Sequence, residues 1–536
     1  MKIIQNIGLS ILVVALVIFT ATSFVGHYTV SQQGFDQWIT AKGIRSEVVI
    51  NEGREQIVGN KFSSQFALSS SILKLAEKSH DIHRANIVEW EKEEGKEEQI
   101  NAEWGKVIWM KWFKNHKELT YDLVKSSVNS PVKENKGLFL FLTFGLASIG
   151  ALMFMLPNVI LLGTAGIKND GIMHSTATNR GWIAMIAFAY LVTFYVVLYF
   201  YPDYLVNQIL LVDPISEMLS GNAASQWFLY GFMYCTVMTL MAVRMFIKYR
   251  HNKYQILRTA SVLFFQIAFA FLIPELLVRF NMPWYDFKNA WPLDYDFFYA
   301  WSLDELRAKG AIGMFILIWG ILLTVVLVPL FVYFFGKRWY CSWVCGCGGL
   351  AETLGDPYRQ LSDKSLKSWK VERWLIHSIL VFATLMTAAT LYTYFTKSET
   401  LFGLVKTSDL QVWYGFLIGS IFAGVIGTGF YPVMGNRVWC RMGCPLAAYM
   451  GIVQRFKSRF RITTNGGQCI SCGNCSTYCE QGIDVRWYAQ RQQNIVRASC
   501  VGCGVCSAVC PRGVLKLENG PEESRFKISE LPNIKK

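Results

Sequence analysis

Charged residues are scarce in this chain, and the attachment motif for haem is absent. Asp, Glu, Lys and Arg make up 17% of the 536 residues, whereas hydrophobic residues make up 52%. This composition excludes an ordinary soluble enzyme and indicates a membrane protein. No Cys-x-x-Cys-His sequence occurs, which excludes covalent c-type haem. The net charge of +14 comes without any nucleic-acid-binding motif, so we expect no nucleic-acid partner.

Long apolar runs account for the low charge. Eight of them approach the ~20 residues that cross a bilayer, and they predict contacts with membrane lipids. We therefore expect a mainly α-helical, polytopic bundle of about eight spans. Residues 1–24 would form an N-terminal anchor, 137–335 a bundle, and 336–455 a further hairpin. The predicted spans are Ile4–Phe24, Gly137–Leu162, Trp182–Tyr201, Trp227–Ile247, Ala260–Phe280, Ile312–Phe335, Leu375–Phe395 and Trp413–Met434.

The distribution of Lys and Arg predicts the orientation. The loops Arg244–Arg258 and Lys337–Arg373 are rich in both, whereas Pro202–Gln226 has neither. Basic loops face the cytoplasm. We therefore expect a protein of the bacterial cytoplasmic (inner) membrane with both termini in the cytoplasm. Residues 25–136, which contain no cysteine, would form an extracytoplasmic domain, with helices predicted at Phe62–Glu94 and Ala102–Ser127.

Two cysteine runs near the C-terminus predict iron–sulfur clusters. Each has the spacing Cys-x2-Cys-x2-Cys-x3-Cys, which wraps a [4Fe–4S] cluster in bacterial ferredoxins. In that pattern the fourth cysteine of one run reaches the cluster of the other. Residues 456–520 would thus form a small α+β domain with two clusters, followed by a tail at 521–536. The predicted ligands are Cys469, Cys472, Cys475 and Cys510 for cluster 1, and Cys500, Cys503, Cys506 and Cys479 for cluster 2.

A second cysteine pattern is repeated inside the membrane part. The sequence Gly-x-Arg-x-x-Cys-x3-Cys begins at Gly336 and again at Gly435. Cysteines four apart share one face of a helical turn, so four thiols would gather at the cytoplasmic membrane surface. They would hold a third cluster or a soft metal ion, act as a redox dithiol pair, or simply be buried structural cysteines. These thiols belong to Cys341, Cys345, Cys440 and Cys444.

The repeat, the hairpin between its copies and the double cysteine tail resemble the membrane polyferredoxins of the NapH and NosR types. The oxidase-assembly protein CcoG is similar in the same segment. The resemblance covers about Ile312–Leu517. It implies electron transfer between the membrane or cytoplasm and a partner outside, and it matches the four motif cysteines to the family's membrane cysteines. This chain departs from the pattern at Gly346 and at Glu480, where the family often has proline.

Together these features predict a membrane-bound electron-transfer protein. A cytoplasmic donor or the quinone pool would exchange electrons with a membrane or periplasmic redox partner. Glu275 is either a proton or quinone site or one half of an ion pair with Arg279. The alternative function is a respiratory-enzyme assembly factor whose membrane cysteines reduce or deliver copper, an option that the extra thiol Cys347 favours.

Overall fold

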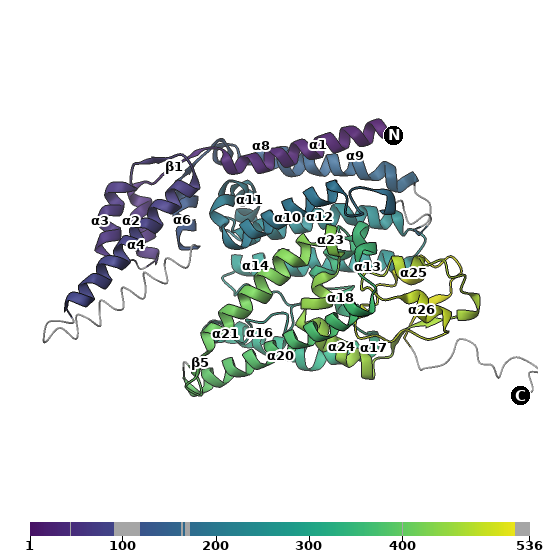
Figure 1. Cartoon of the computed structure of the whole chain (residues 1–536). Helices are drawn as coiled ribbons and strands as arrows, with labels where there is room; N and C mark the ends of the chain where they lie inside the picture. The colour runs from purple at the N-terminus through teal and green to yellow at the C-terminus, as the bar shows by residue number, and fades with distance from the viewer. Residues whose placement is uncertain are drawn as a thin grey trace, which may run out of the picture.

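The long helices of the protein form a bundle, and a small domain lies at each end of it. The computed structural model describes residues 1–42, 44, 46–90, 118–161, 165–166, 172–398 and 400–519. Figure 1 shows long helices lying side by side, with α2 (Gln32–Lys42), α3 (Glu47–Gln56), α4 (Gln65–Trp90) and α6 (Glu118–Ser127) at one end. The C-terminal domain, marked by α25 (Asn474–Thr477) and α26 (Val485–Gln490), lies at the opposite end.

Within the described residues, eight helical segments are long and apolar enough to cross a membrane, as the sequence predicts. By length and composition they indicate a multi-pass membrane protein. We refer to them as spans 1 to 8. They are Lys2–Phe24, Lys136–Leu161, Trp182–Phe200, Gln226–Lys248, Lys253–Arg279, Gly310–Phe335, Leu366–Thr396 and Thr407–Gly429.

The limits of the last two spans differ from the prediction. Span 7 consists of α20 (Leu366–Thr396), which begins nine residues before the predicted Leu375. Its first turns are polar, and the Ser365 hydroxyl caps them by accepting a hydrogen bond from the Ser368 N–H. An apolar run marks the part of a helix that lipid surrounds, whereas capping decides where the helix begins. Span 8 likewise begins at Thr407 instead of Trp413.

The N-terminal domain combines helices with a small sheet. Strand β1 (His27–Thr29) pairs antiparallel with both β2 (Lys61–Phe62) and β3 (Val128–Asn129). The first predicted helix corresponds to α4. Of the second, Glu118–Ser127 is α6, and residues 102–117 lie outside the described residues. Ser69 and Thr120 donate hydrogen bonds to Asp203, which anchors this domain on the bundle.

The C-terminal domain has the expected α+β organisation. Strand β6 (Phe460–Thr464) pairs antiparallel with β7 (Leu515–Asn519), so the strands bracket both cysteine runs. Gly473 and Gly504 occupy the same place in each run, with φ of 81° and 73°. Only glycine adopts such angles at little cost, and each glycine precedes a helix of one turn, α25 or α27 (Val505–Ala508). The two runs therefore fold in the same way.

We predict that the two end domains lie on opposite sides of the membrane. Gly59 and Gly513 lie in open turns of the N-terminal and C-terminal domains, where an added Cβ atom would meet no other atom within 4 Å, so we choose them as insertion sites for an epitope. In intact spheroplasts, an antibody should reach an epitope at Gly59, whereas an epitope at Gly513 should need permeabilised cells. Equal accessibility of the two epitopes in intact cells would contradict this topology.

Candidate metal-cluster sites

The eight C-terminal cysteines divide between two cavities. Cys469, Cys472, Cys475 and Cys510 line the first, together with apolar side chains such as Ile470. The Cys475 thiol lies within electrostatic range of the other three. The first three cysteines of one run are thus grouped with the fourth of the other, which is the arrangement that the spacing predicts.

The second cavity is more deeply buried. It is lined by Cys479, Cys500, Cys503 and Cys506, with Ile462 and Ile495 among its apolar neighbours. Burial raises the pKa of the Cys500 thiol to about 11. Thiolates in such an environment need positive compensation, which bound iron supplies. Four sulfur donors around one apolar cavity therefore fit a [4Fe–4S] cluster.

The four motif cysteines pack into one buried core, but not on continuous helices. Cys341 ends α18 (Arg338–Cys341), and Cys440 lies in the π-helical turn η9 (Trp439–Gly443). Cys345 and Cys444 have extended backbones and cap the next helices, α19 (Gly346–Glu352) and α24 (Pro445–Lys457). The expectation of a shared helical face is therefore wrong, because each pair spans a break between two helices.

The first motif also lies deeper than the cytoplasmic surface that the sequence predicts. The Gln266 amide donates a hydrogen bond to the Val344 carbonyl, and the Tyr234 hydroxyl donates one to the Gly346 carbonyl over 2.9 Å. Gln266 is 13 residues from each end of span 5, which is about 20 Å at 1.5 Å per residue. Cys345, between these two carbonyls, therefore lies near the middle of the bundle.

The motif cysteines have a positively charged surrounding. Arg437 donates hydrogen bonds to the Cys440 sulfur at 3.6 Å and to the Cys341 carbonyl at 3.2 Å. Lys337 lies within electrostatic range of Cys341, and Lys288 within range of Cys345. The Cys347 thiol forms a hydrogen bond with Cys345. Cations from three separate segments thus lie near three of the four motif cysteines, Cys341, Cys345 and Cys440.

In the part of the chain that the structure describes, no three His, Cys, Asp or Glu side chains gather around a single ion position. The thiols of the C-terminal domain instead line two cavities. A [4Fe–4S] core is wider than a single ion, so its ligands are expected to stand around a cavity.

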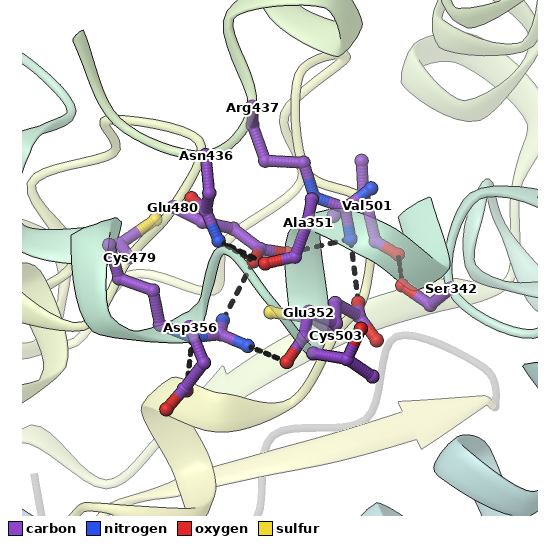
Figure 2. A network of polar contacts seen from close by, with 12 residues as sticks. Ser342, Ala351, Glu352, Asp356, Asn436, Arg437, Cys479, Glu480, Val501 and Cys503 are labelled. Atoms are coloured by element: carbon purple, nitrogen blue, oxygen red, sulfur yellow. Dashed lines mark hydrogen bonds and ion pairs between the residues drawn. The ribbon is translucent and has the colours of Figure 1, made fainter. Parts of the chain in front are cut away.

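Glu480 connects the C-terminal domain to Asn436 and Arg437 of the second membrane motif, as Figure 2 shows, and to the loop that follows the first motif. Its side chain is fully buried and pairs with Arg359 at 2.7 Å and Arg437 at 2.9 Å. The Asn436 amide donates a further hydrogen bond to it at 3.3 Å. Burial alone would raise the pKa of the Glu480 carboxyl, but Arg437, Arg359 and Arg258 lower it to about 2. The carboxyl is therefore ionised at neutral pH.

The two arginines are held in turn by carboxylates of the first motif's loop. Arg437 pairs with Glu352 at 2.6 Å, and Arg359 pairs with Asp356 at 2.8 Å. Sequence reasoning registered Glu480 only as a missing proline and did not find this contact. An acidic residue directly after a ligand cysteine, in a chain whose second motif contains an arginine, was the available signal.

The second cysteine run docks through its backbone. Gln255 and Arg258 of span 5 donate hydrogen bonds to the Cys503 carbonyl, at 2.8 and 2.7 Å. The Ser342 hydroxyl of the first motif donates one to the Val501 carbonyl at 2.9 Å. Cys503 also packs against the core that holds the motif cysteines. The second cavity is therefore the one next to the membrane motifs.

Glu275 and Arg279 do not pair in the way that the sequence allows. Arg279 donates a hydrogen bond to the Met218 carbonyl at 2.8 Å, and Glu275 forms a hydrogen bond with Trp284. Both lie near the C-terminal end of span 5. A proton or quinone role for Glu275 stays a prediction.

Comparison with known proteins identifies iron–sulfur domains in the regions described above. A family model of a 4Fe–4S binding domain matches residues 317–365 and again 414–463, so it covers both copies of the membrane motif. A model of a 4Fe–4S dicluster domain matches residues 461–511. These matches do not single out the NapH, NosR or CcoG type. No solved structure matches the chain.

Two curated relatives are similar over part of the chain. The "Putative electron transport protein YccM" of Escherichia coli is 26% identical over 194 residues, which are 35% of this chain and 51% of that protein. The "Methylamine utilization ferredoxin-type protein MauN" of Methylobacillus flagellatus is 26% identical over 161 residues, 30% of this chain and 54% of that protein. The chain thus spans about half the length of the relatives it matches.

We predict that Glu480→Gln weakens the docking of the C-terminal domain. The substitution removes the buried carboxylate that Arg359 and Arg437 share and leaves them paired with Asp356 and Glu352 alone. Breaking these two buried ion pairs costs about 3 kcal/mol. Limited proteolysis and hydrogen exchange of the domain should show faster cleavage and exchange around β6 and β7. Glu305→Gln, at an exposed position on α15 (Ala300–Ala308), is the matched control. A domain that stays as protected as in the wild type would refute the role assigned to Glu480.

Proposed function

We propose that this protein is a membrane-bound iron–sulfur electron-transfer protein. It relays electrons between a cytoplasmic donor or the quinone pool and a membrane or periplasmic acceptor. The observation that carries the proposal is the direct docking of a two-cavity cysteine domain onto two membrane motifs that a 4Fe–4S domain model also matches. The names of the two relatives, an electron transport protein and a ferredoxin-type protein, agree with it.

The cysteines would hold three clusters. The donor set and the apolar walls of the two cavities favour one [4Fe–4S] cluster in each, held by Cys469, Cys472, Cys475 and Cys510 and by Cys479, Cys500, Cys503 and Cys506. Each cluster supplies reversible one-electron chemistry. The motif cysteines Cys341, Cys345, Cys440 and Cys444 would hold the third, which we call the membrane centre.

The exposure of the cysteines suggests an order for the relay. Cys472 in the first cavity is exposed, which suits electron exchange with a soluble donor. Cys503 in the second cavity is held against span 5 and packs beside the membrane motifs. The buried pairs around Glu480 fix the distance between this cavity and the motifs. The three sites would then follow one another from the cytoplasm into the bacterial inner membrane.

Two observations favour a cluster over copper at the membrane centre. The 4Fe–4S domain model extends across both motifs. Arg437, Lys288 and Lys337 place positive charge near three of the four thiols, which suits a strongly anionic thiolate cluster. The second candidate function, copper reduction or delivery during enzyme assembly, is favoured by the hydrogen bond of the fifth thiol, Cys347, with Cys345.

Metal analysis tests the proposal directly. Anaerobically purified protein should contain about twelve irons per chain, four for each cluster. Cys440→Ser should lower this to about eight and remove one EPR signal after dithionite reduction, while both ferredoxin-type signals remain. Cys235→Ser, within span 4 and outside the motifs, is the matched control and should leave all iron in place.

Two other outcomes of the metal analysis would contradict the proposal. Unchanged iron content and EPR spectrum in Cys440→Ser would contradict the membrane centre. About eight irons in the wild type, together with copper that Cys440→Ser removes, would replace the relay by the assembly function.

A further inference from the structure

An irregular segment enters the bundle from the outer end and approaches the motif cysteines. Residues 280–299, here called the entering loop, connect span 5 to α15 and contain no helix or strand. The Trp291 N–H donates a hydrogen bond to the Thr324 hydroxyl at 3.1 Å, and its indole N–H donates one to the Thr387 hydroxyl at 2.9 Å. Thr324 is 14 residues from the outer end of span 6, which is about 21 Å along the helix.

The entering loop carries ionisable side chains into the bundle. Asp286 and Lys288 form an ion pair at 2.5 Å, and both side chains are at most 8% exposed. Further along, the carboxyl groups of Asp294 and Asp296 lie within hydrogen-bonding range of each other. Non-helical backbone and ionisable groups at membrane depth are costly, and both are typical of functional paths.

These ionisable groups are neighbours in space, and together they reach from the entering loop to the membrane cysteines. Lys288 lies within electrostatic range of both Asp294 and Cys345. Asp286 lies within range of Tyr340, which in turn lies within range of Cys345 and Cys444. Ala290 belongs to the same buried core as the four motif cysteines. The loop thus links the outer end of the bundle to the membrane centre.

Unpaired buried hydroxyls close to these groups indicate that water molecules occupy this part of the bundle. The hydroxyls of Tyr285, Tyr340 and Tyr414 are buried and have no hydrogen-bond partner in the protein. Tyr285 lies within electrostatic range of Asp294 and Asp286, and Tyr414 packs against Tyr295 with ring centroids 5.1 Å apart. Buried polar groups left unpaired by protein are commonly satisfied by internal water molecules. Water between these hydroxyls and the carboxyl groups would complete a hydrogen-bonded path.

We propose that the entering loop takes up a proton from the outer aqueous phase when the membrane centre is reduced, and releases it on oxidation. This inference rests on the proposed function, which supplies the electron. One electron enters the centre, and one proton from a hydronium ion forms an O–H bond on the Asp296 carboxylate, so that both carboxyls are neutral. Oxidation of the centre breaks that O–H bond and returns the proton to the outer phase.

The physical reason is charge compensation. An electron added to a buried site raises the energy of nearby carboxylates, since charges interact strongly where water is excluded. The groups that face Asp294 are Asp286, Lys288, Asp296, Tyr285 and Tyr295. Asp294 and Asp296 lie side by side and are each only partly exposed, and two neighbouring carboxylates cannot both ionise without repulsion, so the pair favours retention of a proton.

The test is the midpoint potential of the membrane centre, measured by EPR redox titration in right-side-out and inverted vesicles. It should fall as the pH on the outer side rises, by up to about 59 mV per tenfold change in proton concentration for one proton per electron. It should not respond to the pH on the cytoplasmic side. Asp294→Asn and Asp296→Asn should each abolish the response, while Asp409→Asn, an exposed carboxyl near the outer end of span 8, should keep it.

Infrared difference spectroscopy on reduction gives a second readout, a protonated-carboxyl band that Asp296→Asn removes. A potential that is independent of pH, or that follows the cytoplasmic pH, would overturn the inference and leave the relay intact. If the Asp294→Asn variant fails to fold or to assemble its clusters, the titration of the wild type at different outer and cytoplasmic pH still tests the inference. Absence of the membrane-centre signal would instead refute the proposed function.

Discussion

The arrangement of the cysteine sites depends on the burial of one carboxylate. Glu480 is fully removed from water, which is tolerable only because Arg359 and Arg437 pair with it. These arginines are themselves fixed by Asp356 and Glu352, so the contact is one part of a buried network of alternating charge. Five cations face three carboxylates in that network, which leaves two positive charges in excess. The cations are Arg244, Lys248, Arg258, Arg359 and Arg437, and the carboxylates are Glu352, Asp356 and Glu480.

The excess positive charge has a use in this location. Arg437 contacts the Cys440 sulfur as well as Glu480, so a single guanidinium connects a motif cysteine to the residue that follows Cys479. Buried ion pairs add little net stability compared with apolar packing, but they specify one geometry, since any other leaves a charge unpaired. We expect specificity to be the benefit here, because electron transfer needs a fixed distance between the second cavity and the membrane motifs more than it needs a stronger interface.

Sequence reasoning succeeded where the information is local. Apolar length gives the eight spans, and the spacing within the two runs gives the grouping of cysteines around the two cavities. It failed where the partner is distant in the chain. The depth of Cys345 follows from Gln266 in span 5, and the docking of Glu480 follows from Arg359 and Arg437. Gln266, a polar side chain in mid-span, and Glu480, a carboxylate in place of proline, were visible in the sequence, but the sequence does not indicate which residues they contact.

The depth of the motifs changes how the membrane has to be crossed. If the four thiols lay at the cytoplasmic surface, the whole hydrocarbon layer of ~30 Å would separate them from an outer acceptor. Gln266 and Thr324 instead place the first motif and the entering loop near the middle of the bundle, each about 20 Å along its helix from the end remote from the C-terminal domain. The first motif and the entering loop thus come from opposite ends of the bundle and meet near its middle. A continuous helix at the same place would have its backbone groups paired internally and would need no polar side chains around it. Irregular backbone at this depth is stable only when its polar groups find partners in the protein. The Gln266, Tyr234, Thr324 and Thr387 side chains supply those partners, and this explains why otherwise apolar spans carry polar residues at these positions.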